Sequence, residues 1–411
     1  MTKNNAHNQL NGWLPLLFYA VLLVGACWIF RAQTHQAAQW RGAYFSMAAN
    51  LDTSGRFLVD TTEINLFDRL PVGQQVDYRF HRSPVSQRTE YVFMQIGYGY
   101  FCALARRLWP FGGDAHAIIM LQTATHVSLC LWLLWLLPTG WRRAAFLLGY
   151  ACNPFVVRYV TYDFYYFWQV IPSFLLVGTY LGWRATGWAG LWLGPLLGSL
   201  FLVRPSMMGA LLGLGCFWVY HRQIGLLMVT ASLAVFVAVT LYRPVQSAPW
   251  RPVYVGIAAY RNPYMNNLSD VAIYDLYKAR TGHTYQYGGS DPAQEKQLTA
   301  VLKADVQTLW HRAPSLFIRN ALLNTLLAFS AGYVAGGGDG LNYTLSALGL
   351  LVLGWLLWRR RYLFVVAVLV TVGTFTLYYP PIPAYMYGAY LLLIMAFVAP
   401  GHKRPAVWRL R

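Results

Sequence analysis

The sequence predicts an all-α protein that crosses a membrane many times. Hydrophobic residues make up 57% of its 411 positions and charged residues only 11%, whereas a soluble domain of this length needs more charge to stay in solution. The 17 Trp and 29 Tyr point the same way, because amphipathic rings gather at the depth of the lipid headgroups. We therefore expect a polytopic membrane protein made of helices.

Apolar runs recur along the whole chain. A membrane-spanning helix needs about 20 mainly apolar residues. Runs of roughly this kind lie at 13–30, 91–109, 115–137, 142–160, 164–183, 187–203, 206–220, 224–242, 316–335, 342–358, 362–379 and 383–399. The runs alone leave ten and twelve spans open as alternatives.

The basic residues favour ten spans, because Lys and Arg in short loops prefer the cytoplasmic side. If 91–109 and 316–335 lie in the membrane interface instead of crossing it, the short basic loops all fall on the side of the N-terminus. These loops carry Arg142, Arg143, Arg184, Arg222, Arg359, Arg360 and Arg361. We expect about ten transmembrane helices plus juxtamembrane helices, with Arg106 and Arg107 near the outer headgroups.

This topology gives a single membrane domain over 1–411 with two regions on the outer side. The first, 31–114, is a loop with juxtamembrane helices, and the second covers 243–341. All 14 Asp and Glu then lie outside or at the outer membrane edge. For a bacterial inner membrane, the outer side is the periplasm.

The net charge of +18 does not indicate nucleic acid. The basic residues form short clusters beside apolar runs, where a nucleic-acid-binding protein would spread them over one soluble face. Membrane lipids are the expected partner of these clusters.

Local patterns in the outer regions resemble one known superfamily. The first loop opens with RGAYFSMAANLDTSGRF, which contains Tyr44; Glu90 lies in RTEYVFMQIGYGYF and Asp163 in RYVTYDFYYFW; a run ends in Leu202-Val203-Arg204-Pro205. In order and pattern, nearly the whole chain resembles the GT-C superfamily of integral-membrane glycosyltransferases. That superfamily includes protein mannosyltransferases and the aminoarabinose transferases that modify lipid A.

The resemblance implies that a sugar moves from a polyprenyl-phosphate carrier to an acceptor on the periplasmic face. The acceptor would be a glycan, a lipid or a protein of the cell envelope. Two positions depart from the family pattern. Trp40-Arg41 occupies the usual acidic position of the first loop, and PPIPAYMYGAYLLL, near the last run, has Tyr385 but lacks the arginine of the family's Arg-Tyr pair.

Such a transfer requires a carboxylate that takes the proton of the acceptor hydroxyl. The candidates are Glu90, Asp163, Asp60 and Glu63. On a helix, Asp60 and Glu63 would share one face, although Asp60-Thr61-Thr62-Glu63 also reads as a helix cap. Asp163 could position the acceptor, orient the base, hold a divalent metal cation, or pair with Arg158.

The transfer also requires positive charge for the departing phosphate. Arg204 is the main candidate, because a guanidinium matches the phosphate oxygens and the expected topology puts Arg204 at headgroup depth. The alternative is ordinary snorkelling of this side chain to the interface. Arg41, Tyr44 and Arg158 complete the expected substrate-binding set.

Two other functions remain open at the level of sequence. A transporter or flippase for a lipid-linked saccharide is one, although segregation of the acids outside the membrane argues against it. The other is a GT-C-like protein without catalysis that serves as a binding or assembly partner, which the two departures would explain. The sugar, the acceptor and any metal requirement are left open.

Overall fold

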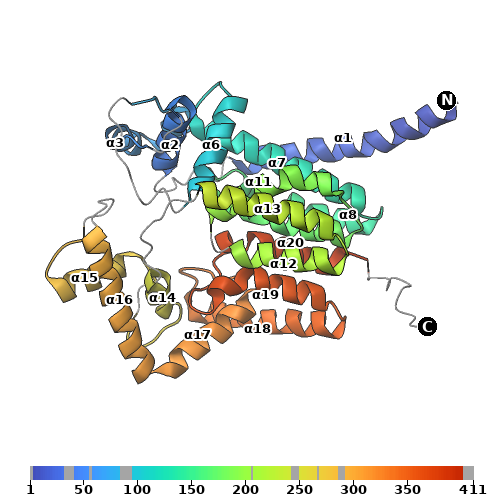
Figure 1. The fold of residues 1–411 in the computed structure, drawn as a ribbon. Helices are drawn as coiled ribbons and strands as arrows, with labels where there is room; N and C mark the ends of the chain where they lie inside the picture. Colours follow the sequence, from blue (N-terminus) through green and yellow to red (C-terminus); the bar gives the residue numbers. More distant parts are fainter. Residues whose placement is uncertain are drawn as a thin grey trace.

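The protein is all-helical in the computed structural model, which describes residues 3–31, 41–54, 58–83, 95–204, 207–241, 250–265, 268–285 and 292–400 (Figure 1). No β-strand forms among these residues. The all-helical part of the prediction is therefore confirmed for them.

Long helices lie side by side in the main body of the molecule (Figure 1). They are α1 (Lys3–Arg31), α7 (Asp114–Leu136), α10 (Ile171–Tyr180), α11 (Gly190–Val203), α12 (Met208–Tyr220), α13 (Ile224–Leu241), α18 (Gly338–Trp358), α19 (Tyr362–Thr376) and α20 (Tyr387–Val398). Among the described residues, α7, α13 and α18 are long and apolar enough to cross a membrane.

The helical geometry changes within several apolar runs. Run 142–160 contains α8 (Trp141–Phe146), the π-helical turn η1 (Leu147–Ala151) and α9 (Pro154–Val160). Pro154 has no amide hydrogen for a continuing helix and disfavours helical geometry at the residue before it. Asn153 is accordingly extended and caps α9 by accepting from the amide of Phe155 at 2.9 Å. Run 164–183 begins as the 3-10 helix η2 (Tyr165–Val170) before it continues as α10.

The helices of the two outer regions gather at the end of the bundle opposite the marked chain termini (Figure 1). The first outer region supplies α2 (Arg41–Ser54), α3 (Thr61–Arg69), α4 (Val72–Asp77) and α6 (Ile96–Leu108). The second supplies α14 (Trp250–Ile257), α15 (Val271–Thr281), α16 (Pro292–Arg312) and α17 (Pro314–Leu327). Helices α14 to α16 enclose a small core of their own, which includes Tyr254, Ile273 and Leu298.

The expected interfacial helices exist as α6 and α17, with 13 and 14 residues. They are as long as α12 and α11, so their interfacial position stays a prediction. The position of Arg106 near the outer headgroups stays a prediction, but its side chain does not lie on an exposed face of α6. Arg106 is buried, forms an ion pair with Asp114 of α7 and donates to the carbonyl of Phe80 at 3.1 Å, because a buried cation needs a counter-charge.

Acidic side chains are unevenly distributed between the two ends of the bundle. At the end nearer the chain termini, Arg361 donates to the carbonyl of Ala399 at 2.8 Å, and Arg184 lies 3.2 Å from the ring of His221. The acidic residues whose side chains the structure describes all lie at the opposite end, on helices of the two outer regions, on loops, or in the first turns of α7 and α18. They are Asp60, Glu63, Asp68, Asp77, Asp114, Asp163, Asp270, Asp275, Glu295, Asp305 and Asp339.

Candidate functional site

Several predicted site residues meet at the acidic end of the bundle. The first outer region reaches this place through α2, and the bundle reaches it through residues 161–164, through η2, and through the end of α11. The 3-10 helix η5 (Pro383–Tyr385), which precedes α20, completes it. The contacts between these elements define the site.

Arg41 and Asp163 form a buried ion pair across 122 positions of sequence. The Nη1 atom of Arg41 lies 2.6 Å from Oδ2 of Asp163, and the two side chains are 3% and 6% exposed. A charge-assisted hydrogen bond is about twice as strong as a neutral one, and it is needed here because each charge alone would be costly to bury. The pair fastens α2 to the segment that leads into η2.

Two further residues hold Arg41 in place. Its other terminal nitrogen donates to Oε1 of Gln75, and its guanidinium lies 5.4 Å from the ring centre of Phe67. Gln75 in turn donates to the carbonyls of Phe67 at 3.0 Å and Leu70 at 2.9 Å. Arg41 is therefore fixed by α3 and α4 as well as by Asp163.

Tyr44 lies beneath this ion pair, one turn along α2. Its ring is fully buried and its hydroxyl donates to Oε1 of Gln95 at 2.5 Å. Its ring packs edge-on against Tyr98 and Phe164, with ring centres 5.1 and 5.8 Å away. Tyr44 therefore packs behind the site as a buried residue. The sequence predicted it among the substrate-binding residues.

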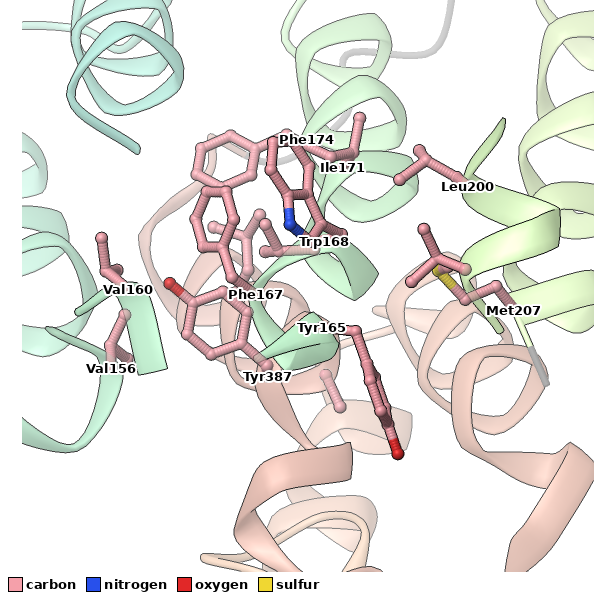
Figure 2. Close-up of a cluster of buried hydrophobic side chains, with 14 of the residues drawn as sticks. Val156, Val160, Tyr165, Phe167, Trp168, Ile171, Phe174, Leu200, Met207 and Tyr387 are labelled. Carbon is pink, nitrogen blue, oxygen red and sulfur yellow. The ribbon is translucent and has the colours of Figure 1, made fainter. Parts of the chain in front are cut away.

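The short helix η2 links the site to the bundle core (Figure 2). Phe167 and Trp168 are buried among side chains of neighbouring helices, and Trp168 stacks on Phe101 with ring centres 3.8 Å apart. Tyr165 is buried as well, and Figure 2 shows its hydroxyl pointing away from the other labelled side chains. Since aromatic packing fixes η2, Tyr165 is held at a set position beside Arg204.

Arg204 lies at the end of α11, half-buried among tyrosines. Its guanidinium carbon is 3.8 Å from the ring centre of Tyr385 and 5.9 Å from that of Tyr165, and Nη1 is 3.4 Å from Oε1 of Gln169. In the part of the chain that the structure describes, no carboxylate forms an ion pair with Arg204. The guanidinium charge is permanent at neutral pH, so this place favours an anion.

Tyr385 lies in the stretch PPIPAYMYGAYLLL, which contains no arginine. Arg204, far away in sequence, supplies a guanidinium against the same ring. An arginine and a tyrosine are therefore paired here in space.

Asp60 and Glu63 hold the first outer region together. The Asp60 carboxylate caps α3 by accepting from the amides of Thr62 at 2.9 Å and Glu63 at 3.3 Å. Glu63 accepts from the hydroxyl of Tyr78 at 3.1 Å and the amide of His81 at 2.9 Å. The capping alternative thus describes the contacts of Asp60.

Hydrogen bonds and burial shift two pKa values in this region. Partial burial acts to raise the pKa of the Asp60 carboxyl. Hydrogen bonds from Ser83 and from the amides of Glu63 and Thr62 outweigh this effect and lower the pKa below its usual value. For Tyr78, burial and the neighbouring Glu63 raise the pKa to about 12. Both shifts favour the protonation states that make these hydrogen bonds at neutral pH.

The remaining predicted site residues are Arg158 and Glu90. Arg158 is exposed on α9, five residues before Asp163. Glu90 lies outside the described residues. Among the His, Cys, Asp and Glu side chains that the structure describes, no group of three or more could hold a metal ion.

Sequence reasoning missed three residues of the site: Gln75, Gln169 and Asp68. A glutamine carries no spacing signal, so the roles of Gln75 and Gln169 follow only from their contacts with Arg41 and Arg204. Asp68 follows Phe67 on α3 and is accessible to solvent. Partial desolvation raises its pKa, and the charge of Arg41 opposes this shift. Its place among the acids of the first loop was the available signal.

Comparison with known proteins adds no relative. No protein-family model, no curated protein and no solved structure matches the chain.

Proposed function

We propose that the chain is a polytopic protein of the bacterial inner membrane that transfers a sugar from a polyprenyl-phosphate carrier to an envelope acceptor on the periplasmic side. The confinement of the described acidic side chains to one end of the bundle supports this topology, as do the basic short loops at the other end, since such loops mark the cytoplasmic side. The three long apolar helices support it as well. The GT-C-like patterns of the outer regions suggest the reaction.

The proposal rests mainly on the environment of Arg204. Its permanent charge has no described carboxylate partner, lies at the acidic end of the bundle and is held between Tyr385, Tyr165 and Gln169. A phosphate monoester or diester would supply the missing negative charge through paired hydrogen bonds. In the proposed topology, Arg204 lies at the depth of the carrier phosphate.

The proposed reaction is a displacement at the anomeric carbon. The acceptor hydroxyl oxygen forms a bond to this carbon, the bond from the carbon to the phosphate oxygen breaks, and the electron pair leaves with the polyprenyl phosphate. A carboxylate takes the hydroxyl proton, and Arg204 stabilises the charge of the departing phosphate.

Asp163 would act as a positioning residue in this reaction. Its ion pair with Arg41 and its 6% exposure leave it poorly placed to accept a proton, but they fix the segment that carries Tyr165. The proton acceptor is then an acid of the first loop. Glu90 is the candidate from the sequence, and Asp68 is the accessible carboxylate near Arg41.

The test uses purified protein in lipid nanodiscs with a radiolabelled polyprenyl-phosphate sugar and an extract of envelope glycolipids as acceptor. We expect label transfer by the wild type. Arg204→Gln should reduce it by roughly 10- to 100-fold, as expected for loss of a hydrogen-bonded charge worth about 1.5–3 kcal/mol. Arg359→Gln, an exposed arginine at the opposite end, is the matched control and should retain activity.

A second candidate, a transporter of a lipid-linked saccharide, is favoured by the interrupted runs. Discontinuous helices often line transport sites. Here the helical structure is interrupted after Ala151 and again between Val160 and Tyr165. Proteoliposomes separate the two functions. Movement of labelled carrier lipid between leaflets without sugar transfer would indicate transport, and transfer that is lost with Arg204→Gln would indicate the glycosyltransferase. Absence of both activities would leave a non-catalytic partner protein.

A further inference from the structure

A group of tyrosine rings lies beside Arg204 at the acidic end of the bundle. They come from five separate places: α9, the turn after it, η2, the segment after α19, and η5. In the same order, the residues are Tyr159, Tyr162, Tyr166, Tyr379 and Tyr385. All five are half-buried, and we call them the tyrosine wall.

The wall is continuous. Tyr166 lies at its centre, with ring centres of Tyr162 at 6.1 Å, Tyr159 at 6.3 Å and Tyr385 at 6.0 Å. The ring centre of Tyr379 lies 5.8 Å from that of Tyr385. Arg204 then covers Tyr385 at 3.8 Å, so the cation stands at the edge of the wall.

These tyrosines differ from the aromatic residues expected at a lipid interface. Interfacial residues of the opposite end are far more exposed, for example Trp188 at 79%, Trp358 at 74% and Tyr220 at 64%. The tyrosines of the wall converge from elements distant in sequence and contact one another. A belt at the membrane interface does not require such convergence, whereas a binding surface does.

The chemistry of the wall fits a sugar. Half-buried rings offer apolar faces to the C–H groups of a pyranose, and phenol hydroxyls offer donors and acceptors to its hydroxyls. Within the described part of the chain, the hydroxyls of Tyr159, Tyr162 and Tyr379 make no hydrogen bond. Tyrosine also loses little conformational entropy on binding, because it has only two side-chain torsions.

We propose that the tyrosine wall is the subsite for the sugar ring of the donor, while Arg204 holds the phosphate to which this sugar is attached. The inference rests on the proposed function, since it assigns the phosphate to Arg204. It adds that the protein distinguishes a glycosylated carrier from the bare carrier phosphate through ring contacts.

The experiment measures binding of two probes to the full-length protein in nanodiscs. One probe is a short-chain polyprenyl phosphate, and the other is the same lipid carrying a hexose. We expect the wild type to prefer the glycosylated probe. Tyr166→Leu should reduce this preference by about 3- to 10-fold, equivalent to one aromatic contact, and should leave the affinity for the bare phosphate unchanged. Tyr166→Phe, which keeps the ring, should retain most of the preference.

Control variants distinguish the sugar subsite from the phosphate site. Tyr362→Leu removes a tyrosine that is 54% exposed at the opposite end and should have no effect on either probe. Arg204→Gln should weaken both probes alike. If it does so while Tyr166→Leu keeps the full preference, the sugar subsite is overturned and the phosphate site stands. If Arg204→Gln changes neither affinity, or if the wild type binds neither probe, both proposals fail.

Folding is checked by gel filtration and circular dichroism of each variant. Should Tyr166→Leu not fold, Tyr162→Leu is the replacement, because Tyr162 lies nearly parallel to Tyr166 with an interplanar angle of 6°. An unchanged preference in that variant overturns the subsite in the same way.

Discussion

Arg41 and Asp163 are joined by a hydrogen bond of 2.6 Å in a place where both side chains are almost fully buried. Sequence analysis treated the two residues as separate site candidates, with Arg41 as a departure at an acidic position. In the structure, the carboxylate that pairs with Arg41 is Asp163, which belongs to the bundle. The pair therefore connects the outer helices to the bundle before any substrate is considered.

Breaking this ion pair should destabilise the protein strongly. Removing one partner of a buried pair leaves an uncompensated charge and costs about 3–5 kcal/mol. We expect Asp163→Asn to lower the unfolding temperature in detergent clearly. Asp305→Asn is the matched control, because its partner Arg280 is 61% exposed and such pairs contribute below about 1 kcal/mol. Equal shifts for the two variants would contradict the structural role of the Arg41 pair.

Asp60 should stabilise α3 as a helix cap. Loss of an N-cap side chain costs about 1 kcal/mol, so Asp60→Ala should lower the free energy of unfolding by this amount and Asp60→Ser should restore most of it. Asp77→Ala, an exposed acid in the last turn of α4, should have little effect. A stable Asp60→Ala variant would show that the cap is dispensable.

The Asp60 contribution should also depend on pH. Because the pKa of Asp60 is lowered in the folded protein, its stabilisation is complete above the unfolded value of about 4 and is lost as the pH falls through the folded value. Unfolding curves of the wild type and Asp60→Ala should therefore converge below pH 4. Curves that stay parallel down to this pH would argue against the cap.

Two glycines of α18 should respond differently to alanine. A Cβ atom at Gly349 would lie 1.9 Å from the carbonyl oxygen of Leu326 on α17, whereas one at Gly354 would meet nothing within 4 Å. Gly349→Ala should push the two helices apart and lower the free energy of unfolding by roughly 1–3 kcal/mol. Gly354→Ala should be neutral or stabilising by up to about 1 kcal/mol. Thermal unfolding of both variants in the same detergent measures the difference.

Cysteine labelling tests the topology. In a Cys216→Ser background, which removes the exposed native thiol, Lys303→Cys on α16 should react with a membrane-impermeant maleimide in intact spheroplasts. Arg359→Cys, at the other end of the bundle, should react only after the membrane is opened. The reverse pattern would invert the proposed orientation.

Much of the helical framework could be predicted from the sequence. Each of the twelve apolar runs contains at least one helix, because hydrophobic runs and helix formation coincide in such chains. The interruptions at Asn153-Pro154 and before η2 were not predicted, although Pro154 is a visible signal. The burial of Arg106 was missed because its partner Asp114 follows it after a loop.

The candidate site was predicted only in part. Arg204 and Asp163 were predicted from local patterns and lie at the same end of the bundle, where Arg204 is beside Tyr165, two residues after Asp163. The contacts that define their roles connect residues far apart in sequence, such as Arg204 with Tyr385, and no local pattern contains such information. The tyrosine wall has the same origin, since its members are scattered over more than 220 positions and converge only in the fold.

The distance in sequence between Arg41 and Asp163 also imposes an order on biosynthesis. At about 5–20 residues per second, the ribosome needs roughly 6–24 s to advance from one to the other. For most of this interval, α2 has been synthesised while Asp163, which pairs with its first residue, has not. We expect the outer helices to stay protease-sensitive in nascent chains arrested before residue 163 and to become resistant in longer ones, which pulse proteolysis of arrested chains would measure.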